Sequence, residues 1–124
     1  MEHTLEVYLD GEVIFYSDGK WLHPLFELEN FLMQQNYDPA SLIIKDKIVG
    51  RAAALIEVYL GFKSVRAGMM SELAKEVLDH FQIDYAYEKL VDRIQCRTEN
   101  LLENEYDPKK GYEWIKGLAS QKNQ

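Results

Sequence analysis

Hydrophobic residues are densest between residues 42 and 60, where a short apolar run precedes a longer and almost continuous one. Leu42–Ile44 is apolar throughout and contains β-branched residues, which is typical of a strand buried on both faces. Ile48–Leu60 has helical length, and its only charged residues are Arg51 and Glu57. A helix that is apolar on nearly every side belongs at the centre of a fold, so this strand and helix are expected to form the core.

The residues that flank this central helix give its expected limits. Asp46 is predicted to be the N-cap, because its short carboxylate can accept hydrogen bonds from the free N–H groups of the first turn. Gly61 is predicted to end the helix by adopting the left-handed conformation.

The segment before this core has the pattern of a β-hairpin followed by a helix. Thr4–Leu9 and Glu12–Ser17 are rich in β-formers and flank Asp10-Gly11, a pair that favours the tight turn of a hairpin. A helix is predicted from Pro24 to about Gln35, since proline suits a first helical turn and apolar residues follow at helical spacing.

The segment after the core alternates strand and helix patterns. Phe62–Ala67 and Ile83–Tyr87 are predicted strands, and Ser71 is the predicted N-cap of the helix between them. Strand–helix–strand–helix–strand at this spacing indicates three parallel strands. Residues 92–106 are predicted to be helical or irregular.

The last predicted helix begins at Asp107-Pro108, an N-cap followed by a first-turn proline. Its core-facing residues are expected to be Gly111, Trp114, Ile115 and Leu118. With 124 residues and no linker or repeat, residues 1–124 are expected to form one domain.

Charge and composition argue against several classes of function. The net charge is −7 and the pI about 4.9, which argues against a nucleic-acid partner, since such partners need clustered Lys and Arg. No apolar segment reaches the roughly 20 residues of a membrane span, and the start lacks the pattern of a signal peptide. Cys96 is the only cysteine, which fits a cytoplasmic protein without disulfides.

Three segments carry a resemblance to a known family: Lys45–Ala54, Met70–Ala74 and Tyr87–Val91. Over these residues the chain resembles a zinc-less branch of the cytidine-deaminase-like fold, made of short, uncharacterised bacterial proteins grouped as a domain of unknown function. The resemblance implies a three-layer α/β/α fold with a mixed sheet, in which an N-terminal β-hairpin precedes a βαβαβ unit and C-terminal helices.

The chain departs from this family after its last predicted strand. Members of the branch usually carry a Gly-rich stretch that ends in Cys-Pro, whereas this sequence has Arg97–Glu103, without those glycines and that cysteine. Any activity that the relatives derive from that stretch is therefore not expected here.

The residues of a zinc deaminase are missing at both helix starts where the enzyme needs them. Such an enzyme has His or Cys followed two residues later by Glu at the first helix start, and Pro-Cys-x-x-Cys at the second. This chain has Gly50-Arg51-Ala52 and Met70–Leu73 there, and the remaining candidates have no metal-ligand spacing: His3, His23, His80 and Cys96. We therefore expect no metal and no cofactor.

A ligand site is expected where the two helices start, because ligands of open α/β sheets bind beyond the carboxyl ends of the parallel strands. Helix N-termini favour an anionic or strongly polar group. The candidate residues are Asp46, Lys47, Gly50, Arg51, Ser71 and Glu72. The alternative is that these residues are ordinary caps and solvated charges. Arg51 interrupts a buried helix, so it needs a partner, either Glu72, Asp46 or a ligand.

Three functions follow from this pattern. The first is a non-catalytic module that binds a small polar or anionic metabolite, such as a nucleotide. The second is an interaction or assembly protein, for example a homodimer, that uses apolar residues at Trp21-Leu22, Met69-Met70 or Trp114. The third is a metal-free enzyme of unknown reaction that uses Ser71, Glu72, Lys47 or Cys96.

Overall fold

The computed structural model describes residues 2–122 and contains a five-stranded sheet in the order β2-β1-β3-β4-β5. The strands are β1 (Leu5–Leu9), β2 (Glu12–Ser17), β3 (Ile43–Val49), β4 (Ser64–Ser71) and β5 (Asp84–Val91). β1 runs antiparallel to β2 and β3, whereas β3 pairs in parallel with β4 and β4 in parallel with β5. The predicted mixed sheet, with its hairpin and three parallel strands, is confirmed.

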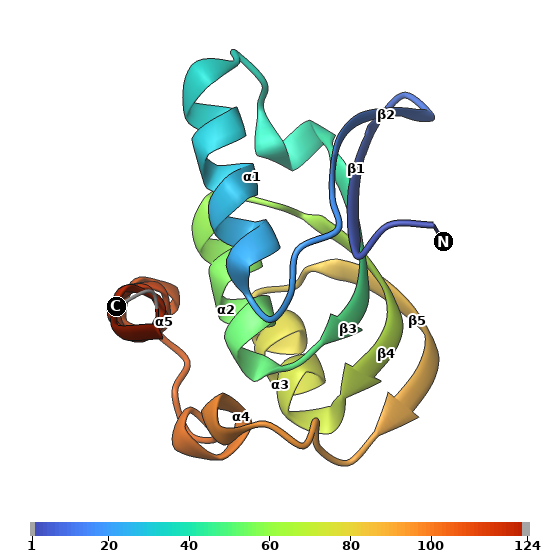
Figure 1. Cartoon of the computed structure of the whole chain (residues 1–124). Helices are drawn as coiled ribbons and strands as arrows, with labels where there is room; N and C mark the ends of the chain where they lie inside the picture. Colours follow the sequence, from blue (N-terminus) through green and yellow to red (C-terminus); the bar gives the residue numbers. More distant parts are fainter. Residues whose placement is uncertain (1, 123–124) are drawn as a thin grey trace.

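The helices gather on one side of this sheet (Figure 1). They are α1 (His23–Gln34), α2 (Arg51–Leu60), α3 (Glu72–His80), α4 (Arg97–Leu101) and α5 (Pro108–Lys122), with a short 3-10 turn, η1, at Pro39–Ser41. α5 packs on α2, outside the layer next to the sheet. The predicted mixed α/β fold is confirmed, and its three layers are the sheet, the helices that pack on it, and α5 outside them. Within residues 2–122 no helix covers the opposite side of the sheet, which stays open.

Several turns and caps form where local sequence predicts them. Asp10 and Gly11 both have positive φ, 50° and 85°, as the tight hairpin turn requires. Gly61 ends α2 in the left-handed conformation at φ 100°. Ser71 Oγ accepts a hydrogen bond from the N–H of Ala74 and caps α3.

The start of α2 differs from the prediction. Asp46 is not a cap, because β3 continues to Val49 and Gly50 is the N-cap. The reason is pairing on both sides: Asp46 lies opposite Leu5 of β1 and Ala67 of β4. Strand pairing therefore holds Asp46 inside the sheet, with only 8% of its surface exposed.

The core lies between the sheet and the helices, and α5 completes it. Its largest fully buried apolar side chains are Leu5, Leu25, Leu28, Leu42, Ile44, Leu55, Ile56, Phe62, Met70, Leu78 and Ile115. A Cβ at Gly111 would lie 2.8 Å from Leu55 Cδ1, so glycine is what lets α5 approach α2 closely. Trp114 does not face the core as predicted but is 39% exposed, where it lines a shallow surface hollow with Leu101 and Leu102. No helix among the described residues has the length and apolar character of a membrane span.

Candidate functional site

A cavity of about 420 Å³ lies at the N-terminus of α2, beyond the end of β3. We call it the α2 cavity. Four segments enclose it: the chain before β1, the loop that leads into α1, the β3–α2 junction, and the segment around α4. Its lining residues are Thr4, Gly19, Lys20, Trp21, Leu22, Asp46, Lys47, Ile48, Gly50, Ala52, Ala53, Ile94, Cys96, Thr98 and Glu99. Asp46, Lys47 and Gly50 of the predicted site are therefore brought together here.

The N-terminus of α2 is occupied by a carboxylate of the protein itself. Glu99 is 1% exposed, and its Oε2 accepts a hydrogen bond of 2.7 Å from the backbone N–H of Arg51. Its other oxygen accepts from the N–H of Ile94 at 3.3 Å. A Cβ at Gly50 would lie 2.7 Å from Glu99 Oε2, so glycine leaves the room that this cap needs. The positive end of the helix, where the sequence predicts a ligand anion, is thus neutralised internally.

Arg51 points away from the α2 cavity, and its predicted partners were wrong. Its Nη1 donates to the carbonyl of Leu73 at 2.9 Å and to Glu76 Oε2 at 3.1 Å, while Nε and Nη2 donate to the carbonyl of Glu105. Its guanidinium also lies 4.5 Å from the ring centroid of Tyr106. Arg51 therefore joins α2 to α3 and to the segment before α5, and it has its partners without a ligand.

Ser71 and Glu72 do not line the cavity either. Ser71 is fully buried and its hydroxyl is used to cap α3, whereas Glu72 is exposed at the start of that helix. The two helix starts therefore do not form one combined site, in contrast to the prediction. Cys96 does line the cavity, with its Sγ 2.9 Å from Thr98 Oγ1.

A buried pair of carboxyl groups lies at the wall of the cavity. Glu57 of α2 is completely buried, and neither of its carboxyl oxygens has a hydrogen-bond partner among the described residues. Asp46 is its charged neighbour. Burial raises the pKa of Asp46 to about 7 against a hydrogen bond from the N–H of Ile48 that lowers it. Burial, together with the charge of Asp46, also raises the pKa of Glu57 well above its usual value.

This pair has a simple chemical consequence. Two ionised carboxylates are both acceptors and repel one another, whereas a proton on one of them makes a hydrogen bond between them possible. Burial raises the pKa of both groups, so the pair keeps a proton at pH values where ordinary carboxyl groups have lost theirs. Asp46 is the member that lines the cavity.

Sequence reasoning missed Glu57 and Glu99 for different reasons. Glu57 was visible as a charge in an apolar helix, which is the signal that singled out Arg51. Glu99 lies 48 residues after Arg51 and carries no local signal of its contact. Among residues 2–122, no three His, Cys, Asp or Glu side chains converge as a metal site would require.

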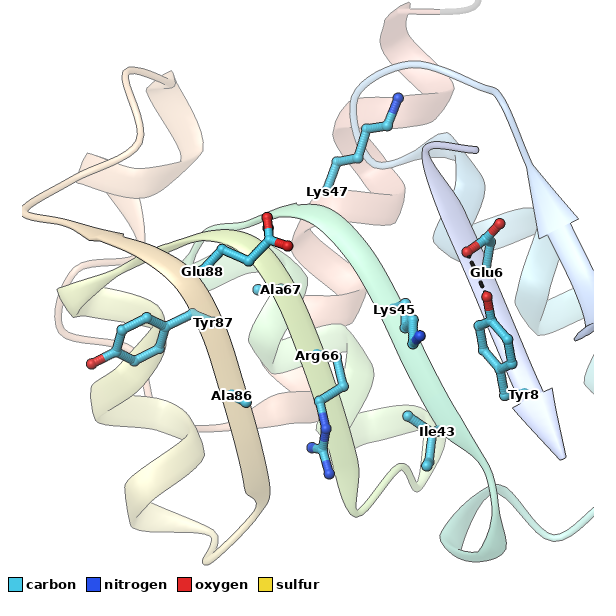
Figure 2. Close-up of a pocket in the computed structure, with 11 residues that line it drawn as sticks. Glu6, Tyr8, Ile43, Lys45, Lys47, Arg66, Ala67, Ala86, Tyr87 and Glu88 are labelled. Carbon is cyan, nitrogen blue, oxygen red and sulfur yellow. Dashed lines mark hydrogen bonds between the residues drawn. The ribbon is translucent and has the colours of Figure 1, made fainter. Parts of the chain in front are cut away.

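A second, shallower cavity of about 680 Å³ lies on the open side of the sheet. We call this surface, formed by Glu6, Tyr8, Ile43, Lys45, Arg66 and Ala86, the open sheet face. Figure 2 shows Lys45 and Arg66 side by side on neighbouring strands, with Tyr8 and Glu6 on the next strand. Tyr8 donates a hydrogen bond to Glu6 at 2.9 Å, and Lys45 lies 4.5 Å from the Tyr8 ring centroid. Lys47 points away from this group.

Comparison with known proteins gives a family. The model of a domain of unknown function, DUF1893, matches residues 2–117. The chain belongs to the DUF1893 family. Its fold is similar to the crystal structure of a DUF1893 family protein (TM1506) from Thermotoga maritima, with a TM-score of 0.80 and 22% identity. The match covers 92% of this chain and 79% of that chain.

The family assignment confirms the predicted membership in an uncharacterised family with a bacterial relative. No curated protein is similar to this chain. Membership in DUF1893 names no activity. The likeness to deaminases remains a prediction from the sequence.

Proposed function

We propose that this DUF1893 protein binds a small polar molecule in the α2 cavity. The observation that supports this most is a cavity of about 420 Å³ with a buried, titratable carboxyl group in its wall. This volume lies in the range of small-molecule sites, about 300–1,000 Å³. The walls are largely apolar, with Trp21, Leu22, Ile48 and Ile94, so a flat apolar body can be enclosed while a few polar groups orient it.

The polar groups of the cavity favour a different kind of ligand from the anion that the sequence predicts. An anionic group at the start of α2 would have to displace the carboxylate of Glu99, which already accepts from Arg51 and Ile94. Asp46 and Thr98 supply hydrogen-bonding atoms at other points of the wall. A base-like, polar ligand therefore fits the cavity better than a phosphate or a carboxylate does.

A fragment screen by thermal shift tests the proposal when it is combined with a variant that fills the cavity. Ile94→Trp places an indole ring at a half-buried position of the cavity wall and so fills part of the cavity. Ala86→Trp is the control, because it places the same ring on the open sheet face. Fragments that raise the melting temperature of the wild type and of A86W, but not of I94W, are expected. Equal shifts in all three proteins, or no fragment that binds, would contradict the proposal.

A second candidate function is self-association through the open sheet face. This surface carries two cations, Lys45 and Arg66, and the exposed Glu88 on β5. A second copy related by a half-rotation about an axis between Arg66 and Glu88 would set the cations of each copy against Glu88 of the other. Light scattering tests this association. We expect the wild type to be a dimer and Arg66→Glu to be a monomer. A wild type that is monomeric at a concentration on the order of 0.1 mM would refute the proposal.

A further inference from the structure

The acidic groups around the α2 cavity differ in what they can offer a ligand. The oxygens of Glu99 are taken by backbone N–H groups of Arg51 and Ile94. Glu57 is completely buried and does not line the cavity. Asp46 is the acidic residue that lines it with capacity to spare, since among residues 2–122 one backbone N–H, that of Ile48 at 3.3 Å, donates to its carboxyl group.

No basic side chain neutralises this wall among residues 2–122. Lys20 and Lys47 line the cavity but are exposed, and neither forms an ion pair with Asp46 in the described part of the chain. A buried carboxylate without a cation is costly. A ligand that brought its own positive charge would supply the missing partner.

We infer that the α2 cavity selects a ligand with a cationic nitrogen attached to a flat apolar body. This inference rests on the proposed function and specifies its ligand class. The nitrogen donates hydrogen bonds to the carboxylate of Asp46. The apolar body packs between Trp21, Ala53 and Ile94, which line the same cavity. An amidinium, guanidinium or protonated amine on an aromatic ring has this chemistry, and charge-assisted bonds of this kind are the strong ones.

The burial of Asp46 gives this site a dependence on pH. Burial raises the pKa of Asp46 to about 7, so its carboxyl group loses its proton near neutral pH. A cation binds the ionised form, so binding releases a proton and becomes tighter as pH rises from 6 to 8. The charged or titratable groups around Asp46 are Glu57 from α2, Lys47 from β3, Lys20 from the loop before α1, and Cys96 and Glu99 from the segment around α4.

Three matched probes test the ligand class: benzamidine, benzamide and benzoate, which share a ring and differ in charge. Their affinities are measured by ¹H–¹⁵N NMR titration at pH 8, with the cavity resonances of Gly50, Ala53 and Thr98 as reporters. We expect benzamidine to bind about tenfold more tightly than benzamide, and benzoate to bind most weakly. From pH 8 to pH 6 the affinity for benzamidine should fall about tenfold.

Asp46→Asn should lower the affinity for benzamidine about tenfold and leave benzamide within about twofold. Asp92→Asn makes the same change at an exposed side chain near the cavity segment and should change neither. Benzoate binding best, equal binding of all three probes, or no binding at these residues would overturn the inference. Failure of the proposed function gives a different result. In that case no fragment, whatever its charge, raises the melting temperature of the wild type more than that of I94W.

Discussion

Replacing Asp46 by Asn should make the protein more stable at high pH and leave its stability at low pH nearly unchanged. The pKa of Asp46 rises from its ordinary value of 3.8 to about 7 because the carboxyl group is buried. Between these values the folded protein keeps a proton that the unfolded chain has released. Rising pH therefore favours the unfolded chain, and Asn, which does not titrate, removes this effect.

The magnitude follows from the two pKa values. Each pKa unit corresponds to about 1.4 kcal/mol, so the whole effect of Asp46 amounts to about 4 kcal/mol once the pH exceeds 7. Of this, about 2 kcal/mol develops between pH 5.5 and pH 8, a range that lies above the pI of about 4.9. The free energy of unfolding of D46N relative to wild type should therefore increase by about 2 kcal/mol over that range.

Urea unfolding at pH 5.5, 6.5, 7.25 and 8, followed by circular dichroism, measures this difference. Asp92→Asn is the matched control, because its side chain is 93% exposed, and its difference from wild type should stay within about 0.5 kcal/mol at every pH. A difference between D46N and wild type that does not change with pH would show that Asp46 titrates normally. The account of the carboxyl pair would then be wrong.

Three further substitutions test contacts around α2, each by urea unfolding at pH 7. Glu99→Ala should lower the free energy of unfolding by about 1–3 kcal/mol, because the cap of α2 is lost. The control Glu113→Ala, at an exposed position of α5, should change it by less than about 0.5 kcal/mol. An effect of Glu99→Ala under about 0.5 kcal/mol would refute the cap. Arg51→Met should lower the free energy of unfolding by about 3–5 kcal/mol, because it leaves the carbonyls of Leu73 and Glu105 without their donor. Unchanged stability would contradict the structural role of Arg51. Gly111→Val should lower the free energy of unfolding by about 1–3 kcal/mol, because the added side chain overpacks against Leu55. Unchanged stability would show that α5 does not pack closely on α2 at this position.

The parts of the fold that the sequence predicts well are those with local causes. Asp10-Gly11 makes its turn because both residues adopt positive φ, and Ser71 caps α3 through a bond that spans three residues. The central strand and helix follow from their own apolar residues. None of these features depends on a contact with a distant segment.

The errors have the opposite character. A polar residue after an apolar run has the pattern of a helix cap, yet Asp46 lies inside β3 because β1 and β4 pair with it from both sides. Arg51 was expected to meet Glu72 or Asp46, but the fold brings Glu76 and the carbonyl of Glu105 to it. Only three-dimensional packing determines these contacts.

The ligand site expected from the sequence stays a prediction, but a cavity occupies the place where it was expected. The cavity does lie at the start of α2, beyond β3, with Asp46, Lys47 and Gly50 in its wall. Its electrostatic character differs from the prediction, since Glu99 fills the position expected for an anion. That residue belongs to the segment in which this sequence departs from the resemblance, where no family pattern could identify its role.

A crystal structure of the protein soaked with benzamidine at pH 8 tests the central claim most directly. The account predicts the amidinium within hydrogen-bond distance of the Asp46 carboxylate and its ring between Trp21, Ala53 and Ile94. Benzamidine on the open sheet face instead, or an α2 cavity that stays without the probe at saturating concentration, would contradict it.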